Sequence, residues 1–308
     1  MSNYLLTLLG SSVDYFYESD TYPEEGDFSH ARFLGTSAGG CPFNVGAVCA
    51  SKNAEVKTLD MLGKEDDSTP FLLSESKRLN MDCSNVTVEE NVSNGKVMII
   101  NTGDKRTMFV IDPIRPKYVV DEKMQELLNN SGYIYSLMHI VNRSFDSIEP
   151  LIKAKQNGAK VIFDGSSKYD DPSRVKMLYD LADGLFINST DFSRLKEHSE
   201  DDPRNILFSK GAEFICVTDG SIGTMLYTKD NTYYEESVKN VKVSDSTGAG
   251  DSFAGTFLAC LLLGYSYDKA LKYATVSGAY ACTVFGGLGG VADFKTLEEF
   301  AKEHNYDL

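Results

Sequence analysis

Residues 243–255, Val-Ser-Asp-Ser-Thr-Gly-Ala-Gly-Asp-Ser-Phe-Ala-Gly, constrain the fold and the chemistry of this chain more than any other stretch. Residues 233–243 alternate in the manner of a strand, and residues 253–263 form an apolar run typical of a buried helix. The small residues between them let backbone N–H groups at a helix start approach an anion closely. Asp251 follows in the first turn of that helix. The pattern predicts a strand, an anion-binding loop and a helix, with a carboxylate beside the anion.

A carboxylate at such a position suits phosphoryl transfer better than simple anion binding. The N–H groups of Gly248, Ala249 and Gly250 would stabilise charge that develops on the phosphoryl group. Asp251 would accept the proton of the attacking hydroxyl. The alternative interpretation is that Asp251 only caps the apolar helix.

The composition of the chain excludes several classes of protein. With 308 residues and 42% hydrophobic content, the chain suits one large α/β domain, alone or with a small appendage. The net charge of −15 and the lack of a Lys/Arg cluster disfavour nucleic-acid binding. Six cysteines without a CxxC pair indicate reduced thiols. Without a signal peptide or a membrane-length apolar run, we expect a cytoplasmic protein that does not enter a membrane.

From residue 120 onward, helical and strand patterns alternate, which predicts a mostly parallel sheet with helices on both faces. The expected strands are residues 4–9, 56–62, 133–137, 161–163, 184–187 and 214–218, and the expected earlier helices are 42–53 and 69–79. Two segments, about 13–36 and 95–112, do not fit the layered pattern. The second contains strands at 97–100 and 107–111 and is entered through an Asn94-Gly95 turn. We expect both segments to form a small second sheet inserted in a single domain of residues 1–308.

The segment from Asp245 to Asp251 resembles the C-terminal signature of the ribokinase-like (PfkB) carbohydrate kinases of the fructokinase and ribokinase type. Thr256 stands where that pattern has Ala or Gly, at a packing position. The resemblance extends over essentially the whole chain and implies a ribokinase-like α/β fold with the small sheet as a lid over the sugar. It implies ATP-dependent transfer of the γ-phosphoryl group to a primary hydroxyl of a small carbohydrate. In that reaction Asp251 is the general base and the backbone of 248–250 is the anion hole.

Further matches to motifs of the same family indicate which residues bind the sugar. Residues 39–44, Gly-Gly-Cys-Pro-Phe-Asn, resemble the N-terminal glycine motif of the same family, and Gly10-x-x-x-Asp14 resembles the end of its first strand. The residues that the resemblance assigns to the sugar are Asp14, Gly39, Gly40 and Asn44. Residues 103–108 are similar to a lid strand of adenosine kinases, and Arg106 is suited to a sugar-acid carboxylate, as in ketodeoxygluconate kinases. A nucleoside and a ketodeoxy sugar acid therefore stay open as substrates. Residues 163–168 resemble a strand end that usually reads Asp-x-Asn-x-Arg, with Ser166 and Lys168 replacing its last two polar groups.

The motifs that the resemblance assigns to the nucleotide also occur in the order that the family has along its chain. Asn188-Ser-Thr-Asp191 resembles an Asn-x-x-Glu motif that organises Mg²⁺ and phosphate, with a helix N-cap at Ser189 or Thr190 as the alternative interpretation. The remaining residues assigned to the nucleotide are Thr218, Gly220, Ser221, Gly223, Gly248 and Gly250. Asp245 and Thr247, with backbone carbonyls of residues 282–287, match a monovalent-cation site, which makes K⁺ a further expected cofactor beside ATP and Mg²⁺.

Two other functions compete with the kinase. Residues 35–39, Gly-Thr-Ser-Ala-Gly, fit the nucleophile-elbow pattern of serine hydrolases with Ser37 as nucleophile, although few βα units precede it. The other is a non-catalytic sugar sensor on the same fold, which the presence of Asp251 disfavours. Finally, an aromatic cluster in the first lid segment predicts a homodimer formed through the lid; its members are Tyr15, Phe16, Tyr17, Phe28 and Phe33.

Overall fold

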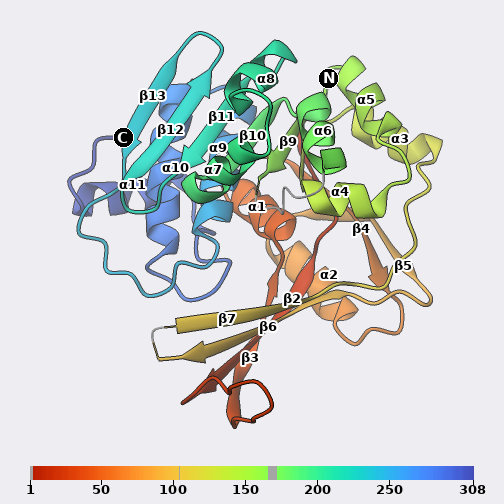
Figure 1. The fold of residues 1–308 in the computed structure, drawn as a ribbon, viewed down its shortest axis with the longest axis vertical. Helices are drawn as coiled ribbons and strands as arrows, with labels where there is room; N and C mark the ends of the chain where they lie inside the picture. The colour runs from red at the N-terminus through yellow and green to blue at the C-terminus, as the bar shows by residue number, and fades with distance from the viewer. Residues whose placement is uncertain (1–2, 104, 166–171) are drawn as a thin grey trace.

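The computed structural model describes residues 3–103, 105–165 and 172–308, and it has two sheets of unequal size (Figure 1). A nine-stranded sheet with helices on both faces forms the body of the molecule. A four-stranded sheet projects from one end of that body, at the bottom of the view in Figure 1. The expected α/β class with a separate small sheet is confirmed.

The large sheet has the strand order β13-β12-β11-β10-β9-β8-β1-β4-β5. Its strands from β5 to β11 along this order are parallel, and β12 and β13 form an antiparallel edge. The bounds are β1 Leu5–Leu8, β4 Val56–Gly63, β5 Asp82–Glu89, β8 Tyr133–Leu137, β9 Lys160–Asp164, β10 Gly184–Asn188, β11 Phe214–Thr218, β12 Gly223–Thr228 and β13 Thr232–Glu236. The central strands are mostly apolar and buried, because both of their faces are covered.

Two hydrophobic clusters fill the space between this sheet and its helices. Neighbouring residues of β1 belong to different clusters, since Leu5 packs on one side and Leu6 on the other. The first side carries α1 Cys41–Ala50, α2 Thr69–Arg78, α9 Ala249–Leu262, α10 Tyr267–Ala281 and α11 Phe294–Glu303. The second carries α3 Glu122–Asn129, α4 Met138–Ser144, α5 Glu149–Gln156, α6 Pro172–Leu181, α7 Ser189–Glu197 and α8 Pro203–Ser209. Within the described part of the chain, none of these helices has the length and apolarity needed to cross a bilayer.

The small sheet consists of β2 Ser12–Ser19, β3 Ala31–Gly39, β6 Gly95–Thr102 and β7 Lys105–Ile111, in the order β3-β2-β6-β7. It joins segments far apart in sequence, because β2 pairs in parallel with β6, with Asp14 opposite Val97. Its two hairpins, β2 with β3 and β6 with β7, are antiparallel.

The structure corrects three local expectations. The strand predicted over residues 233–243 ends at Glu236, where its pairing with β12 ends at Gly223, so residues 237–248 run on as an irregular segment. Strands β5 and β12 were not predicted. Asn94 does not form a hairpin turn; its buried side chain donates to the hydroxyls of Ser68 and Thr69 and anchors the start of β6.

Candidate active site

The loop before α9 has the conformation that an anion site needs. Gly248 is the N-cap residue with φ of 74°, and a Cβ there would lie 2.2 Å from the carbonyl oxygen of Gly287. Helix α9 begins directly after it, so the N–H groups of its first turn point out of the helix. A Cβ on Gly250 would meet no atom of the described residues within 4 Å, which leaves the space over this turn open. The N–H of Ala249 already makes a long contact of 3.4 Å with the Ser246 carbonyl oxygen.

Asp251 does not cap α9. Its Oδ2 accepts a hydrogen bond of 2.7 Å from Nδ2 of Asn44, which comes from α1, and helix α9 has no side-chain N-cap contact. The pKa of Asp251 is raised to about 6, chiefly by burial; the nearby carboxylates of Asp164 and Asp14 add to this effect, and hydrogen bonds from Cys41 and Asn44 oppose it. A carboxylate with such a pKa is ionised near neutral pH and has gained basicity. The geometry therefore suits a general base and not the capping role.

The predicted sugar-side residues lie together beside this carboxylate. Asp14 on β2 is buried, its Oδ1 accepts a hydrogen bond of 3.3 Å from Ser12, and burial raises its pKa to about 6. Gly39 packs against it, since a Cβ there would lie 2.4 Å from Asp14 Oδ2. Gly40 has φ of 95°, and a Cβ would lie 1.8 Å from the Gly10 carbonyl oxygen. The Oδ1 atom of Asn44 is buried without a hydrogen-bond partner among the described residues, so an acceptor remains free beside Asp251.

Three further groups lie at this floor, and the sequence assigned a role to none of them. The thiol of Cys41, at the first residue of α1, contacts the Tyr135 hydroxyl at 3.2 Å, and that hydroxyl donates to Asp164 Oδ2 at 3.4 Å. Asp164 is the last residue of β9, and Tyr135 lies in the middle of the adjacent parallel strand β8. Ligands of open α/β sheets bind at the C-terminal ends of the strands, so this position is a signal that points to Asp164. Ser166 and Lys168, which the sequence associates with Asp164, lie outside the described residues.

A cavity of about 480 Å³ borders the other side of the same loop. It brings together the predicted residues Thr218, Gly220, Ser221 and Gly223 with Ala249 and Gly250. Its remaining walls come from the irregular segment and from α9 and α10, and include Ser237, Asn240, Val241, Val243, Ser246, Phe253, Thr275, Gly278, Ala279 and Cys282. Sequence reasoning missed the wall residues of 237–243 because the alternation before the glycines predicts a strand there.

Asn188 and Asp191 pair with each other at the start of α7. Asn188 caps α7, its Oδ1 accepting from the Asp191 N–H at 2.8 Å, so the cap is Asn188 and not Ser189 or Thr190. Asp191 Oδ2 accepts from Asn188 Nδ2 at 2.7 Å, and Oδ1 pairs with Arg194 at 2.9 Å. Among the described residues, no three His, Cys, Asp or Glu side chains cluster in a way that would hold a metal ion.

Arg106 reaches the loop from β7. Its Nη1 lies 3.0 Å from Asp245 Oδ1 and also contacts the Thr247 hydroxyl. The Asp245 carboxylate additionally accepts from the Thr247 N–H and hydroxyl and from the Gly286 N–H. Burial acts to raise the pKa of Asp245, but these hydrogen bonds outweigh it, and the pKa is lowered. Arg106 is thus paired in this structure and does not point free into the sugar side.

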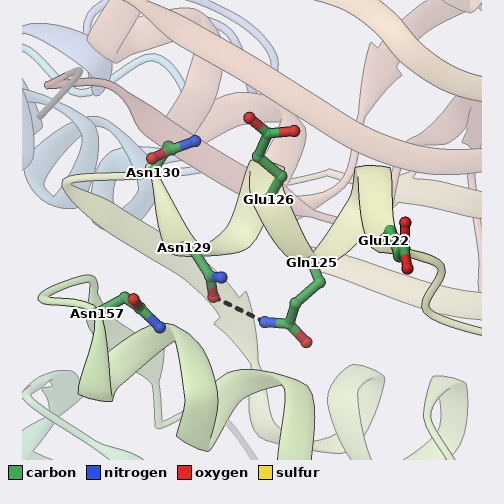
Figure 2. Close-up of a pocket in the computed structure, with 6 residues that line it drawn as sticks. All are labelled: Glu122, Gln125, Glu126, Asn129, Asn130 and Asn157. Carbon is green, nitrogen blue, oxygen red and sulfur yellow. Dashed lines mark hydrogen bonds between the residues drawn. The ribbon is translucent and has the colours of Figure 1, made fainter.

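A second hollow, shown in Figure 2, lies between α3 and α5. It is lined by Glu122, Gln125, Glu126, Asn129, Asn130 and Asn157. Gln125 Nε2 donates to Asn129 Oδ1 at 2.8 Å and to the Pro150 carbonyl oxygen at 3.0 Å, and Asn157 Nδ2 donates to the Lys153 carbonyl oxygen at 2.8 Å, so these amides are already engaged. Figure 1 places α3 and α5 at the opposite end of the large sheet from α10 and α11, and this hollow is separate from the site.

Ser37 lies within β3 of the small sheet and not at a strand-to-helix turn. Its hydroxyl donates to the carbonyl oxygen of Ala38 at 2.9 Å. A nucleophile elbow presents its serine at the end of a strand of the main sheet. The position of Ser37 therefore does not support the hydrolase alternative.

The fold and the site define a kinase of small molecules, and comparison with known proteins agrees. The model of the pfkB family carbohydrate kinases matches residues 5–291. The chain belongs to this family. It is thus a phosphotransferase with an alcohol group as acceptor, as the sequence predicted.

Three relatives illustrate the range of the similarity. The ribokinase of Dictyostelium discoideum is 26% identical over 305 residues, covering 90% of this chain and 95% of the relative. The 5-dehydro-2-deoxygluconokinase of Halalkalibacterium halodurans is 24% identical over 277 residues, covering 83% and 82%. The structure of Arabidopsis thaliana ribokinase complexed with ribose and ATP superposes with a TM-score of 0.82 at 21% identity, covering 98% of this chain and 99% of that one.

Proposed function

We propose that this protein is an ATP-dependent sugar kinase in which Asp251 takes the proton from a primary hydroxyl of the sugar. The observation that carries the proposal is the place of Asp251, buried beside Asn44 at the first turn of α9, with a pKa raised to about 6. A base of this strength is ionised at neutral pH and lies beside helix N–H groups that suit a phosphoryl anion.

In the proposed reaction, ATP occupies the 480 Å³ cavity, with Thr218 to Gly223 along its phosphates. The sugar lies over Asp14, Gly39, Gly40 and Asn44. As the γ-phosphoryl group moves in line, Asp251 accepts the hydroxyl proton and the N–H groups of 248–250 stabilise the developing charge. The small sheet covers the sugar side as a lid, within a single domain of residues 1–308.

We propose Mg²⁺ as the companion of the ATP phosphates, whose charge it would neutralise. The chain's own residues fit direct ligation poorly, because both oxygens of Asp191 already accept from Asn188 and Arg194. Asn188 and Asp191 would contact the hydrated ion through water. If turnover survived a chelator undiminished, this assignment would be wrong.

The charges at the floor favour a neutral polyhydroxylated substrate over a sugar acid. Asp14, Asp164 and Asp251 are close enough for the two others to raise the pKa of Asp251. A substrate carboxylate would be repelled by this set, whereas sugar hydroxyls would donate to it. Arg106, the cation that suits a sugar acid, is paired with Asp245. A nucleoside, which is neutral and carries a ribose, remains the alternative substrate.

We also propose a homodimer that forms through the small sheet. Of the aromatic cluster expected there, Phe28 and Phe33 are exposed, Phe16 is buried, and Tyr15 and Tyr17 are partly buried. Further exposed apolar residues on β3 and β7 are Leu34, Met108, Phe109, Val110 and Ile111. A second copy of this face would cover them. Light scattering at micromolar concentration tests this, and a monomer would contradict it. A cytoplasmic location stays a prediction.

The decisive experiment measures ADP release from ATP over a panel of neutral sugars, sugar acids and nucleosides, for the wild type and Asp251→Asn. Asn is as good an N-cap as Asp but has no basic oxygen, so we expect turnover to fall on the order of 10²–10⁴-fold. The matched control is Asp293→Asn at the N-cap of α11, which should keep activity because that residue only caps a helix. Near-normal turnover of the Asp251 variant would refute the assignment. ADP release by no member of the panel would favour a sugar sensor, and labelling of Ser37 by a serine-directed reagent would favour a hydrolase.

A further inference from the structure

An arginine–aspartate ion pair binds the turn that precedes the proposed anion hole to the small sheet. Arg106, at the start of β7, pairs with Asp245 at 3.0 Å and contacts the Thr247 hydroxyl. The side chain of Asp245 is 12% exposed and that of Arg106 is 30% exposed, so the pair is partly shielded from water. A second contact lies beside it, where the rings of Phe16 on β2 and Phe285 are 5.1 Å apart.

The family resemblance implies a monovalent cation at Asp245, Thr247 and the carbonyls of 282–287, and the residues present do not fit one. Asp245 Oδ1 accepts from Arg106 and from the N–H and hydroxyl of Thr247, and Oδ2 accepts from the Gly286 N–H. Oδ1 therefore accepts three hydrogen bonds and has no lone pair left for a metal ion, and Oδ2 has one of its two lone pairs engaged.

Two backbone carbonyls of that region are also engaged. The Cys282 carbonyl oxygen accepts the N–H groups of Ser244 at 2.7 Å and Asp245 at 3.2 Å, and the Gly286 carbonyl oxygen accepts that of Gly289 at 3.1 Å. An alkali ion would have to displace these bonds and to approach a guanidinium of its own sign.

We propose that Arg106 is a positioning residue that supplies, from the lid, the positive charge beside Asp245 that a monovalent cation would otherwise provide. A guanidinium forms charge-assisted hydrogen bonds to a carboxylate and stays charged at every working pH. The same bond ties β7 to the turn that leads into Gly248, so the lid and the anion-hole loop are held in one arrangement. The enzyme is then independent of K⁺ as long as Arg106 is present.

The test compares the melting temperature and the turnover of the full chain in KCl and in tetramethylammonium chloride at equal ionic strength. The wild type should behave alike in both salts. Arg106→Gln should lose turnover by about tenfold in tetramethylammonium chloride, regain part of it in KCl, and acquire a rise in melting temperature specific to K⁺. The control is Arg143→Gln, which removes a different Arg–Asp pair, between Arg143 and Asp112 directly after β7, 2.6 Å apart. This variant should have the same turnover and melting temperature in both salts.

A K⁺-specific stabilisation or stimulation of the wild type would overturn the proposal, and so would an Arg106→Gln variant that folds yet ignores K⁺. Should that variant fail to fold, Arg106→Lys keeps the charge without the planar fork and is expected to stay K⁺-independent. The turnover readout rests on the proposed kinase function, but the melting temperature does not. If no substrate is turned over while the K⁺-specific shift appears in Arg106→Gln, the proposed function fails and this inference stands.

Discussion

Replacing Asp251 by Asn should stabilise the empty protein although it lowers turnover. Burial raises the pKa of this carboxyl from 3.8 to about 6, so the folded state resists its ionisation. A shift of about 2 pKa units corresponds to about 3 kcal/mol of free energy of unfolding, lost when the group is ionised in the fold. The amide of the variant would carry no charge, and its carbonyl oxygen would still accept from Asn44. We therefore expect the variant to be more stable than the wild type by up to about 3 kcal/mol at pH 8.

The sign of this effect depends on pH. Below pH 3.8 both the folded and the unfolded wild type hold the proton, and the variant gains nothing. Between 3.8 and about 6 the folded wild type binds more protons than the unfolded chain, so its stability falls as the pH rises. Urea unfolding of both proteins at pH 4, 6 and 8 measures the difference. A gain that is absent at pH 8, or equal at pH 4 and 8, would refute the reasoning.

Asp66 supplies a control of opposite sign. Although burial raises its pKa, hydrogen bonds from Ser68 and from the Asn94 N–H lower it to about 2. Its stabilising contribution is present above the unfolded pKa and is lost as the pH falls toward 2. Asp66→Asn should therefore be less stable than the wild type at pH 8 and approach it in acid, with turnover retained.

Three further outcomes are expected. Gly39→Ala places a methyl group 2.4 Å from the Asp14 carboxylate, so KM for the sugar should rise by about tenfold or more in steady-state assays while KM for ATP stays unchanged. Burial lowers the pKa of Lys52 from 10.5 to about 8, so Lys52→Met should raise the free energy of unfolding by up to about 3 kcal/mol at pH 7. That gain should shrink as the pH rises from 8 toward 10.5, and a gain that does not depend on pH would contradict it. The acid limb of the turnover profile should lie near pH 6, the pKa of Asp251, and a limb near pH 4 would show that another group titrates.

The sequence determined the layered fold and the residues of the loop because both are local patterns. Mostly apolar strands such as 133–137 and 214–218 were predicted with the bounds that the structure has, since strands buried on both faces are nearly continuous apolar runs. The start of α9 followed from the glycines and the apolar run after them. The small sheet was expected from its strands, although its pairing of β2 with β6 is a long-range contact.

The tertiary structure decided what each site residue touches, because those contacts join segments far apart in the chain. Nothing near Asp251 in sequence specifies Asn44, which lies 207 positions away, or the carboxylates that raise its pKa. The strand expected to run to residue 243 stops at Glu236, because edge pairing with β12 ends there and no neighbour among the described residues extends it. Arg106 had a charge that suited a substrate, and only the folding of β7 over the loop gave it Asp245 as a partner. Spacing in a sequence defines which chemistry a residue offers, whereas burial and long-range pairing define its pKa and its partner.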